Sequence, residues 1–241
     1  MRKLERPSLS AHTSSVLRKR TKSVSASSDQ AAKSKQLWKS RKNKAFQEIR
    51  QKLSATCTGR IRCMYCEDSE ATDIEHFYPK GTYPLRSFRW DNYLLACSNC
   101  NSNFKRTLFP LSSTGEPQLI NPFDDEPFEH ISLSLSTGKF VPLTPKGRES
   151  IKVFGLDRQT LERGRRDTWT VISALITKYD QLDRTTDPDS AQSIVTALDR
   201  TSFSCVTSFV RTNFLLGTLS AVAPAEVIAA LGANPEIVSA L

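Results

Sequence analysis

The 241-residue chain is long enough for one substantial domain or two small ones, and its 38% of hydrophobic residues suits a folded protein. No apolar run approaches the roughly 20 residues of a membrane span, and the apolar core of a secretory signal is missing, so we expect a cytoplasmic protein without a membrane partner. Residues 1–44 hold 13 Lys or Arg against two acidic residues, a net charge of +11, whereas the remaining 21 basic and 23 acidic residues leave −2. This uneven charge argues against a protein whose whole surface coats nucleic acid.

Residues 1–34 are rich in Ser, Thr, Lys and Arg and contain few large apolar side chains. Such a composition predicts a basic, disordered arm, because the segment buries too little surface to offset its ordering entropy. A solubilising tail, a phosphate-binding or partner-docking arm, and a segment that mimics an organelle transit peptide all fit the composition. From Lys35 to Leu53 the apolar positions follow helical spacing and predict one amphipathic helix.

The rest of the chain divides at about residue 144. Residues 107–128 contain four prolines and predict an extended connection, and residues 131–141 alternate around Thr137-Gly138 as in a hairpin. Beyond this point the periodicity becomes helical, with Asp157 and Asp187 as expected helix starts. The predicted helices are 146–154, 158–183, 189–199, 203–217 and 224–231.

Four of the six cysteines form two Cys-x2-Cys pairs, Cys63 with Cys66 and Cys97 with Cys100. Zinc is commonly held by four thiolates in a tetrahedron, and two such short pairs supply them with little backbone strain. In a reducing compartment, clustered cysteines are metal ligands more often than disulfides. The sequence therefore predicts a structural zinc site. The 30 residues between the pairs exceed the spacing of a simple zinc ribbon, which indicates an insertion with a role of its own.

That insertion contains Glu75-His76, at the end of an alternating segment that predicts a strand and shortly before a turn at Pro79. An imidazole can take a proton from water at neutral pH, as hydrolysis of a phosphodiester requires. Carboxylate and amide oxygens bind hard divalent cations such as Mg²⁺ or Mn²⁺. We therefore expect His76 to act as the base and Glu75 with Asn101 to hold a catalytic ion. Asp73 is the reserve ligand.

Four other residues have two readings each. Asn92 precedes an apolar run, where it belongs to the candidate site or caps a helix expected over residues 93–105. Lys105 lies one turn after Asn101, where it contacts a phosphate or is simply solvated. Arg86 and Arg89 lie in the inserted loop, where they contact a nucleic-acid backbone or face solvent.

The pattern CxxC, EHxxP, WxN, CxxCN over residues 63–105 resembles the core of a zinc-containing HNH (ββα-metal) nuclease. The resemblance implies that His76 is the general base, that Glu75 and Asn101 hold the catalytic metal, and that Asn92 braces the histidine loop. Glu stands where Asp is commoner before the histidine, which leaves the ligand role of Glu75 less defined.

The phrases DIEHFYPK, WDNYLLAC and LINPFDDEPFEHI resemble the PtuB family of HNH proteins, and the last of them is absent from generic HNH modules. Family membership would imply an anti-phage role beside an ATPase of the PtuA type, as in Septu systems and some retrons. Nothing in composition or spacing indicates that partnership.

Taken together, we predict an α+β protein: a disordered basic arm (1–34), a nuclease domain stapled by structural zinc (35–143) and a helical C-terminal region (144–241) that docks a partner. The expected reaction is hydrolysis of phosphodiester bonds, in DNA by default or in structured RNA such as tRNA. A zinc-binding nucleic-acid or adaptor module without catalysis, and a scaffold that keeps only the nuclease shape, are the alternatives.

Overall fold

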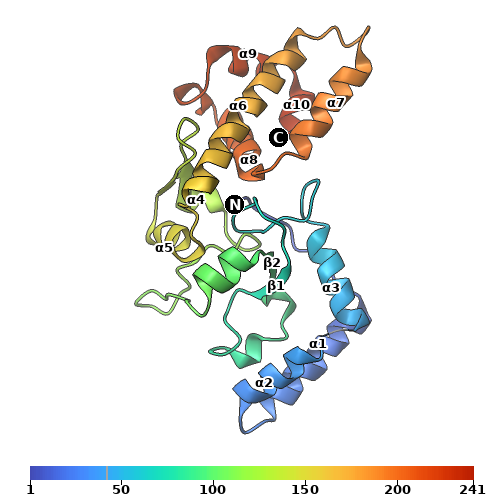
Figure 1. The fold of residues 1–241 in the computed structure, drawn as a ribbon, viewed down its shortest axis with the longest axis vertical. Coiled ribbons are helices and arrows are strands. Elements are labelled where there is room, and N and C mark those ends of the chain that lie inside the picture. The colour runs from blue at the N-terminus through green and yellow to red at the C-terminus, as the bar shows by residue number, and fades with distance from the viewer. Residues whose placement is uncertain (42) are drawn as a thin grey trace.

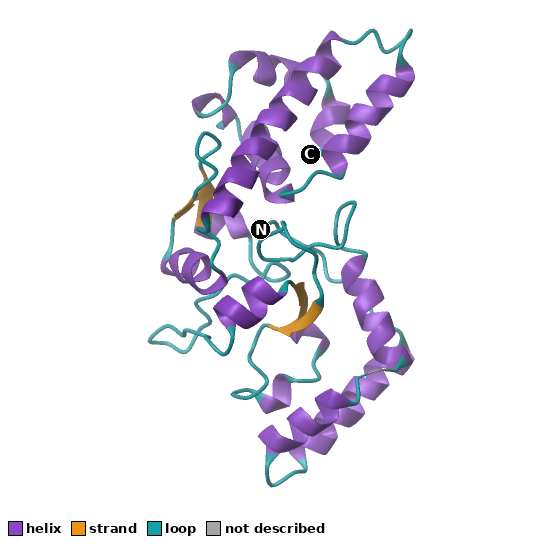
Figure 2. Ribbon diagram, in the orientation of Figure 1, coloured by secondary structure: helices purple, strands orange, loops and turns teal. Residues whose placement is uncertain are grey.

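The computed structural model describes residues 1–41 and 43–241, and the chain is elongated (Figure 1). The N-terminal helices lie at one end and the C-terminal helices at the other, with the cysteine module between them. Figure 2 shows that helices dominate and that the strands form two small sheets. Each sheet has two strands, so the mixed fold that the sequence predicts is confirmed at this level.

Three helices form the N-terminal end: α1 (Ala11–Ser25), α2 (Gln30–Lys39) and α3 (Lys44–Ser54). The predicted disorder of residues 1–34 differs from the structure, in which side chains before each helix accept its first free amides. Two apolar residues of α1, Leu17 and Val24, are buried, and Glu48 of α3 binds the start of α1. These two apolar residues are enough to dock the helix because they lie on the same face of it. The single helix expected over 35–53 is wrong, because α2 and α3 are separate; position 42 between them lies outside the described residues.

The central module is built on two antiparallel strands, β1 (Asp73–His76) and β2 (Tyr93–Ala96), in which Asp73 pairs with Ala96 and His76 with Tyr93. A π-helical segment, η3 (Asn99–Lys105), follows β2. The helix expected over 93–105 is therefore wrong in its first third. All four residues of β2 are buried, and a short continuous apolar run does not distinguish a buried strand from a helix.

The short helix α4 (Pro127–His130) leads into the predicted hairpin, which is confirmed as β3 (Ile131–Leu133) paired with β4 (Phe140–Pro142). Its turn passes Gly138 at φ +71°, a left-handed conformation that suits glycine. A Cβ atom at this position would lie 1.9 Å from the carbonyl oxygen of Glu162. The hairpin turn therefore packs directly on the backbone of the following helical region.

The C-terminal region confirms the five predicted helices: α5 (Pro145–Phe154), α6 (Gln159–Gln181), α7 (Pro188–Asp199), α8 (Ser204–Leu215) and α9 (Ala225–Ala233). A sixth, α10 (Pro235–Ala240), was not predicted. Asp187 caps α7 by accepting a hydrogen bond from the amide of Ser190, as expected, whereas Arg158 and not Asp157 precedes α6. Among the described residues no helix combines the length and the apolar character that crossing a membrane requires.

Candidate active site and metal centre

The four cysteines of the two pairs meet in the central module. Their sulfur atoms all lie within 4.8 Å of one another and are buried, and Sγ of Cys66 is 3.9 Å from Sγ of Cys97. A tetrahedron with Zn–S bonds of about 2.3 Å separates its sulfurs by about 3.8 Å. Antiparallel pairing of β1 with β2 produces this arrangement, because it places the loop before β1 beside the residues after β2. The donor set and its spacing fit a structural zinc ion.

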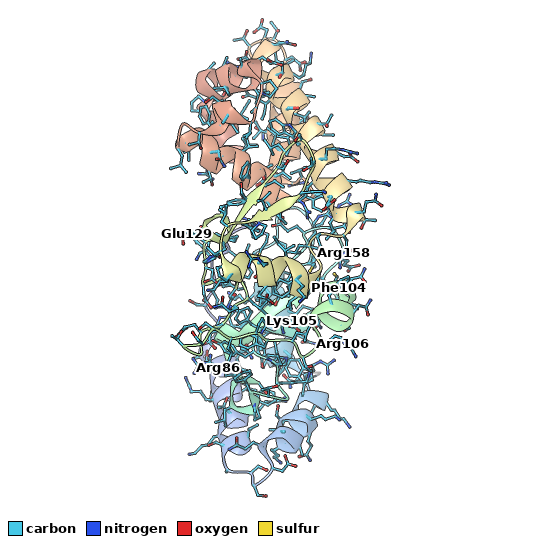
Figure 3. The ribbon with its side chains drawn as sticks, turned by 90° about the vertical axis from the view of Figure 1, so that its left-hand side faces the viewer. Arg86, Phe104, Lys105, Arg106, Glu129 and Arg158 are labelled. Atoms are coloured by element: carbon cyan, nitrogen blue, oxygen red, sulfur yellow. The ribbon has the colours of Figure 1, made fainter. Side chains whose placement is uncertain are left out.

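Arg158, at the start of α6, contacts this cluster from the C-terminal region. Its Nη2 atom donates a hydrogen bond to Sγ of Cys100 at 3.5 Å, and its guanidinium lies 4.9 Å from the ring of Phe104. Figure 3 labels both side chains, Phe104 within η3 and Arg158 next to it. Four thiolates around one Zn²⁺ carry net negative charge, so a neighbouring cation stabilises the cluster.

His76 lies at the end of β1, only 4% exposed, with Nε2 3.0 Å from the carbonyl oxygen of Ser87. A carbonyl oxygen only accepts hydrogen bonds, so Nε2 carries the proton and Nδ1 keeps its lone pair. Burial, reinforced by the positive charge of Lys80, lowers the pKa of His76 to about 3. The ring is therefore neutral at pH 7, with a lone pair at Nδ1.

Asn92 holds the chain that follows the histidine. Its Oδ1 accepts a hydrogen bond from the amide of Tyr78 at 2.7 Å, and its Nδ2 donates to the carbonyl oxygens of Tyr78 at 3.1 Å and Arg86 at 2.9 Å. The residue after Asn92 begins a strand, so the alternative of a helix cap is wrong. These three bonds tie the two ends of the inserted loop together.

Glu75 and Lys105 form a buried ion pair, with Nζ of Lys105 2.6 Å from Oε1 of Glu75 and side chains 1% and 6% exposed. The same Nζ donates to the carbonyl oxygen of His76 at 2.9 Å. The reading of Lys105 as a solvated side chain is therefore wrong, whereas its contact with a phosphate stays a prediction. Asn101 donates through Nδ2 to Oδ2 of Asp73 at 3.0 Å. The structure thus joins Asn101 to Asp73, the reserve metal ligand. The carboxylate of Glu75 is instead paired with the ammonium group of Lys105.

A cleft of about 740 Å³ opens beside these residues, and Asp73, Glu75, His76 and Asn101 all line it. Cations from several parts of the chain line the same cleft, namely Arg41, Arg50, Lys80 and Arg106. Sequence reasoning missed these four. Two sequence signals could have identified them: Arg106 directly follows Lys105, and Lys80 lies within the phrase DIEHFYPK.

Arg86 and Arg89, for which the sequence left a contact with nucleic acid open, lie away from this cleft. The guanidinium of Arg86 stacks 3.9 Å from the ring centroid of Tyr78, and Arg89 pairs with the partly exposed carboxylate of Asp91. Neither residue lines the cleft. Arg86 supports the loop instead, because its carbonyl oxygen also accepts the hydrogen bond from Asn92.

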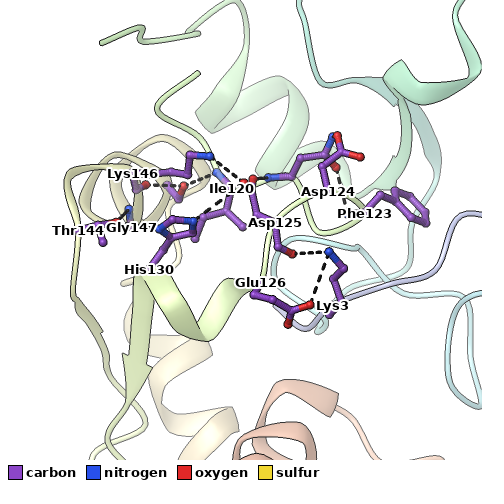
Figure 4. A network of polar contacts seen from close by, with 12 residues as sticks. Lys3, Ile120, Phe123, Asp124, Asp125, Glu126, His130, Thr144, Lys146 and Gly147 are labelled. Carbon is purple, nitrogen blue, oxygen red and sulfur yellow. Dashed lines mark hydrogen bonds and ion pairs between the residues drawn. The ribbon is translucent and has the colours of Figure 1, made fainter. Parts of the chain in front are cut away.

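The phrase LINPFDDEPFEHI forms a second polar network, drawn in Figure 4. The carboxylate of Asp125 pairs with Lys146 at 2.7 Å, and Nδ1 of His130 lies 3.0 Å from Oγ1 of Thr144. Lys3 donates to the carbonyl oxygen of Asp125 at 3.1 Å and lies 3.6 Å from Glu126. This network therefore joins the first residues of the chain to α5, and its role is architectural.

Two curated proteins are similar to the chain, and both are named Septu protein PtuB. One, from Bacillus mycoides (strain KBAB4), is 32% identical over 135 residues, which are 43% of this chain and 45% of that protein. The other, from Bacillus thuringiensis, is 35% identical over 112 residues, which are 44% of this chain and 41% of that protein. The chain thus matches less than half the length of each relative. No family model and no solved structure matches it.

Proposed function

Because this chain belongs to the PtuB family, we propose that it is a metal-dependent endonuclease of the HNH type that serves in anti-phage defence. The β1–β2 pair followed by η3, with the four cysteines at its base, supports a ββα-metal core. The reaction would be hydrolysis of a phosphodiester bond.

The geometry of His76 carries this proposal. Ser87 holds the proton on Nε2, so the lone pair of Nδ1 is available to take a proton from water. Asn92 fixes the loop behind it, and the depressed pKa keeps the ring unprotonated at neutral pH. A general base requires both a fixed tautomer and a place on the wall of the cleft, and His76 has both.

The charges of the cleft favour a polyanionic substrate. Four cations line it against the carboxylates of Asp73 and Glu75, and Lys105 already neutralises Glu75. Contacts to phosphates supply most of the affinity of proteins for nucleic acid without reading its sequence. DNA is the default substrate, and structured RNA such as tRNA fits the same cleft chemistry.

Asp73 and Asn101 are the residues that we assign to the catalytic divalent ion. The hydrogen bond through Nδ2 leaves the amide oxygen of Asn101 available, and Asp73 adds a carboxylate, so two hard oxygen donors meet at the cleft. A divalent ion bound there would neutralise charge on the phosphate and on the leaving oxygen. Glu75 would act mainly by holding Lys105, which in turn holds the backbone of His76.

The partner that we propose is an ATPase of the PtuA type, docked on the C-terminal helices and controlling access to the cleft. Leu215 and Leu216, at the end of α8, are 66% and 70% exposed and offer an apolar contact. Control by a partner also fits the harm that an unrestrained nuclease would do to its host.

The test is a cleavage assay with Mg²⁺ and with Mn²⁺ on plasmid DNA and on total RNA, for the chain alone and co-purified with its neighbouring ATPase. We expect His76→Ala to lose activity by at least about a hundredfold, with unchanged zinc content and circular dichroism. His12→Ala, on the exposed side of α1, is the matched control and should retain activity. Equal cleavage by wild type and His76→Ala would refute the assignment.

A further inference from the structure

The ring of His76 contacts a side chain from outside the cysteine module. Trp38 of α2 lies with its ring centroid 4.3 Å from that of His76, at an interplanar angle of 62°. Phe46 and Tyr93 surround the indole at 5.4 and 5.8 Å. Edge-on aromatic contacts of this kind have a preferred geometry, so they restrict how the imidazole can rotate.

Helix α2 also contacts Ser87, the residue whose carbonyl oxygen binds His76. The carbonyl oxygen of Ser87 accepts hydrogen bonds from Nε2 of His76 at 3.0 Å and from the hydroxyl of Tyr93 at 2.7 Å. The hydroxyl of Ser87 bonds to that of Ser34 at 2.6 Å, and both serines are fully buried. Ser34 and Trp38 are four residues apart and therefore share one face of α2.

We infer that α2 positions the catalytic histidine, with Ser34 fixing the carbonyl group that orients Nε2 and Trp38 fixing the plane of the ring. This inference rests on the proposed role of His76 as the base. Both residues act through His76 and are positioning residues, because neither has a reacting group of its own in this role. The basic N-terminal segment then contributes to the active centre by orienting His76.

The physical reason is that Nδ1 is useful only if the ring keeps its orientation. The bond to Ser87 selects the tautomer, and the indole blocks rotation about the side-chain bonds. Displacing a reacting group by about 1 Å can cost about a hundredfold in rate. Figure 1 shows how this is arranged: α2 lies beside the segment that follows β1, and it packs on the short helix Pro84–Arg86 just before Ser87.

The first experiment reads the imidazole directly, by long-range ¹⁵N–¹H spectra of the full chain labelled at its three histidines. Wild type should show a single Nε2-protonated tautomer for His76. In Ser34→Ala and Trp38→Ala we expect tautomer exchange and broadening at His76 alone, with His12 and His130 unchanged. Trp38→Phe, which keeps an aromatic ring, should restore most of the wild-type signal.

Gln36→Ala, on the exposed side of the same helix, is the control and should leave all three signals unchanged. An unchanged His76 signal in both Ser34→Ala and Trp38→Ala would overturn the inference. If Trp38→Ala does not fold, as judged by zinc content and circular dichroism, Ser34→Ala decides the matter, and an unchanged His76 signal in that variant overturns the inference.

Kinetics provide the second measurement. We expect kcat of Trp38→Ala to fall by about ten- to a hundredfold while KM changes by less than about twofold, with rescue by Trp38→Phe. A change in KM alone would instead make Trp38 a substrate contact and would overturn the positioning role. If wild type cleaves nothing, the proposed function fails, whereas the nitrogen spectra still test the inference about α2.

Discussion

Nζ of Lys105 occupies the position next to Glu75 where the sequence motif led us to expect a metal ion. The 2.6 Å ion pair is almost completely buried, and the same ammonium group binds the carbonyl oxygen of His76. A side-chain cation thus provides the positive charge beside Glu75 and fixes the end of β1 with it. The consequences can be tested separately for stability and for metal binding.

Removing Lys105 should destabilise the fold strongly. Lys105→Ala leaves the carboxylate of Glu75 buried without its partner, which typically costs about 3–5 kcal/mol in the free energy of unfolding. Urea denaturation should show this loss, and Lys105→Met combined with Glu75→Gln should lose less than the sum of the two single variants. Lys35→Ala, an exposed lysine of α2, is the control. A loss below about 1 kcal/mol for Lys105→Ala would mean that Glu75 has another partner.

Metal binding should depend on Asp73 more than on Glu75. We expect Asp73→Asn and Asn101→Ala to weaken the binding of Mn²⁺ by at least about tenfold, because they remove the oxygen donors that face the cleft. Glu75→Gln should change this affinity less. Calorimetric titration of the zinc-loaded protein with Mn²⁺ measures the effect without an activity assay. If Glu75→Gln has the largest effect, the ion displaces Lys105 from Glu75, and Glu75 is a metal ligand as the sequence motif implies.

Zinc retention should depend on Arg158. Arg158→Gln removes the cation that donates to Sγ of Cys100, and we expect zinc to be lost to a chromophoric chelator at a concentration about tenfold lower. Arg163→Gln, exposed on the same helix, should behave like wild type. Complete removal of zinc should unfold the central module, since such a site contributes on the order of 10 kcal/mol to folding. Equal retention by both variants would show that the N–H···S contact adds nothing.

Docking of α1 should weaken in acid through Glu48. Hydrogen bonds from Thr13 and Ser10 lower the pKa of Glu48 from 4.5 to about 2. Because the folded state holds the ionised form, this stabilisation is fully present above pH 4.5 and is lost as the pH falls through about 2. The difference in Tm between wild type and Glu48→Gln should therefore shrink over this range. A constant difference would mean that the charge of Glu48 does not hold α1.

Local signals explain which predictions succeeded. The two Cys-x2-Cys pairs, the turn at Gly138 and the cap at Asp187 depend on residues a few positions apart, and the structure has each of them where it was expected. The errors lie where a pattern was ambiguous or sparse. A four-residue buried strand was read as helix, and a basic segment with few apolar residues was read as disordered.

The roles of single residues at the site depended on distant partners. The sequence left Lys105 as a phosphate contact or a solvated side chain, and it lies beside Glu75 because η3 packs back against β1. Arg86 and Arg89 are close to the motif in sequence yet lie away from the cleft, whereas Arg41 and Arg50 line it from the N-terminal helices. Sequence spacing places residues along one element, but it does not say which faces of two elements meet.

The sequence by itself determined the chemistry that is available: four thiolates at metal-binding spacing, a histidine next to a carboxylate, and the side-chain amides of Asn92 and Asn101 close to them in the chain. Only the tertiary structure decided which of those groups contact one another. It paired Asn101 with Asp73, gave Lys105 to Glu75, and brought Ser34 to Ser87 across 53 residues of chain. The spacing within each Cys-x2-Cys pair places two thiolates side by side, which is a local property of the chain, whereas the meeting of the two pairs and the orientation of His76 depend on elements that come together only in the folded chain.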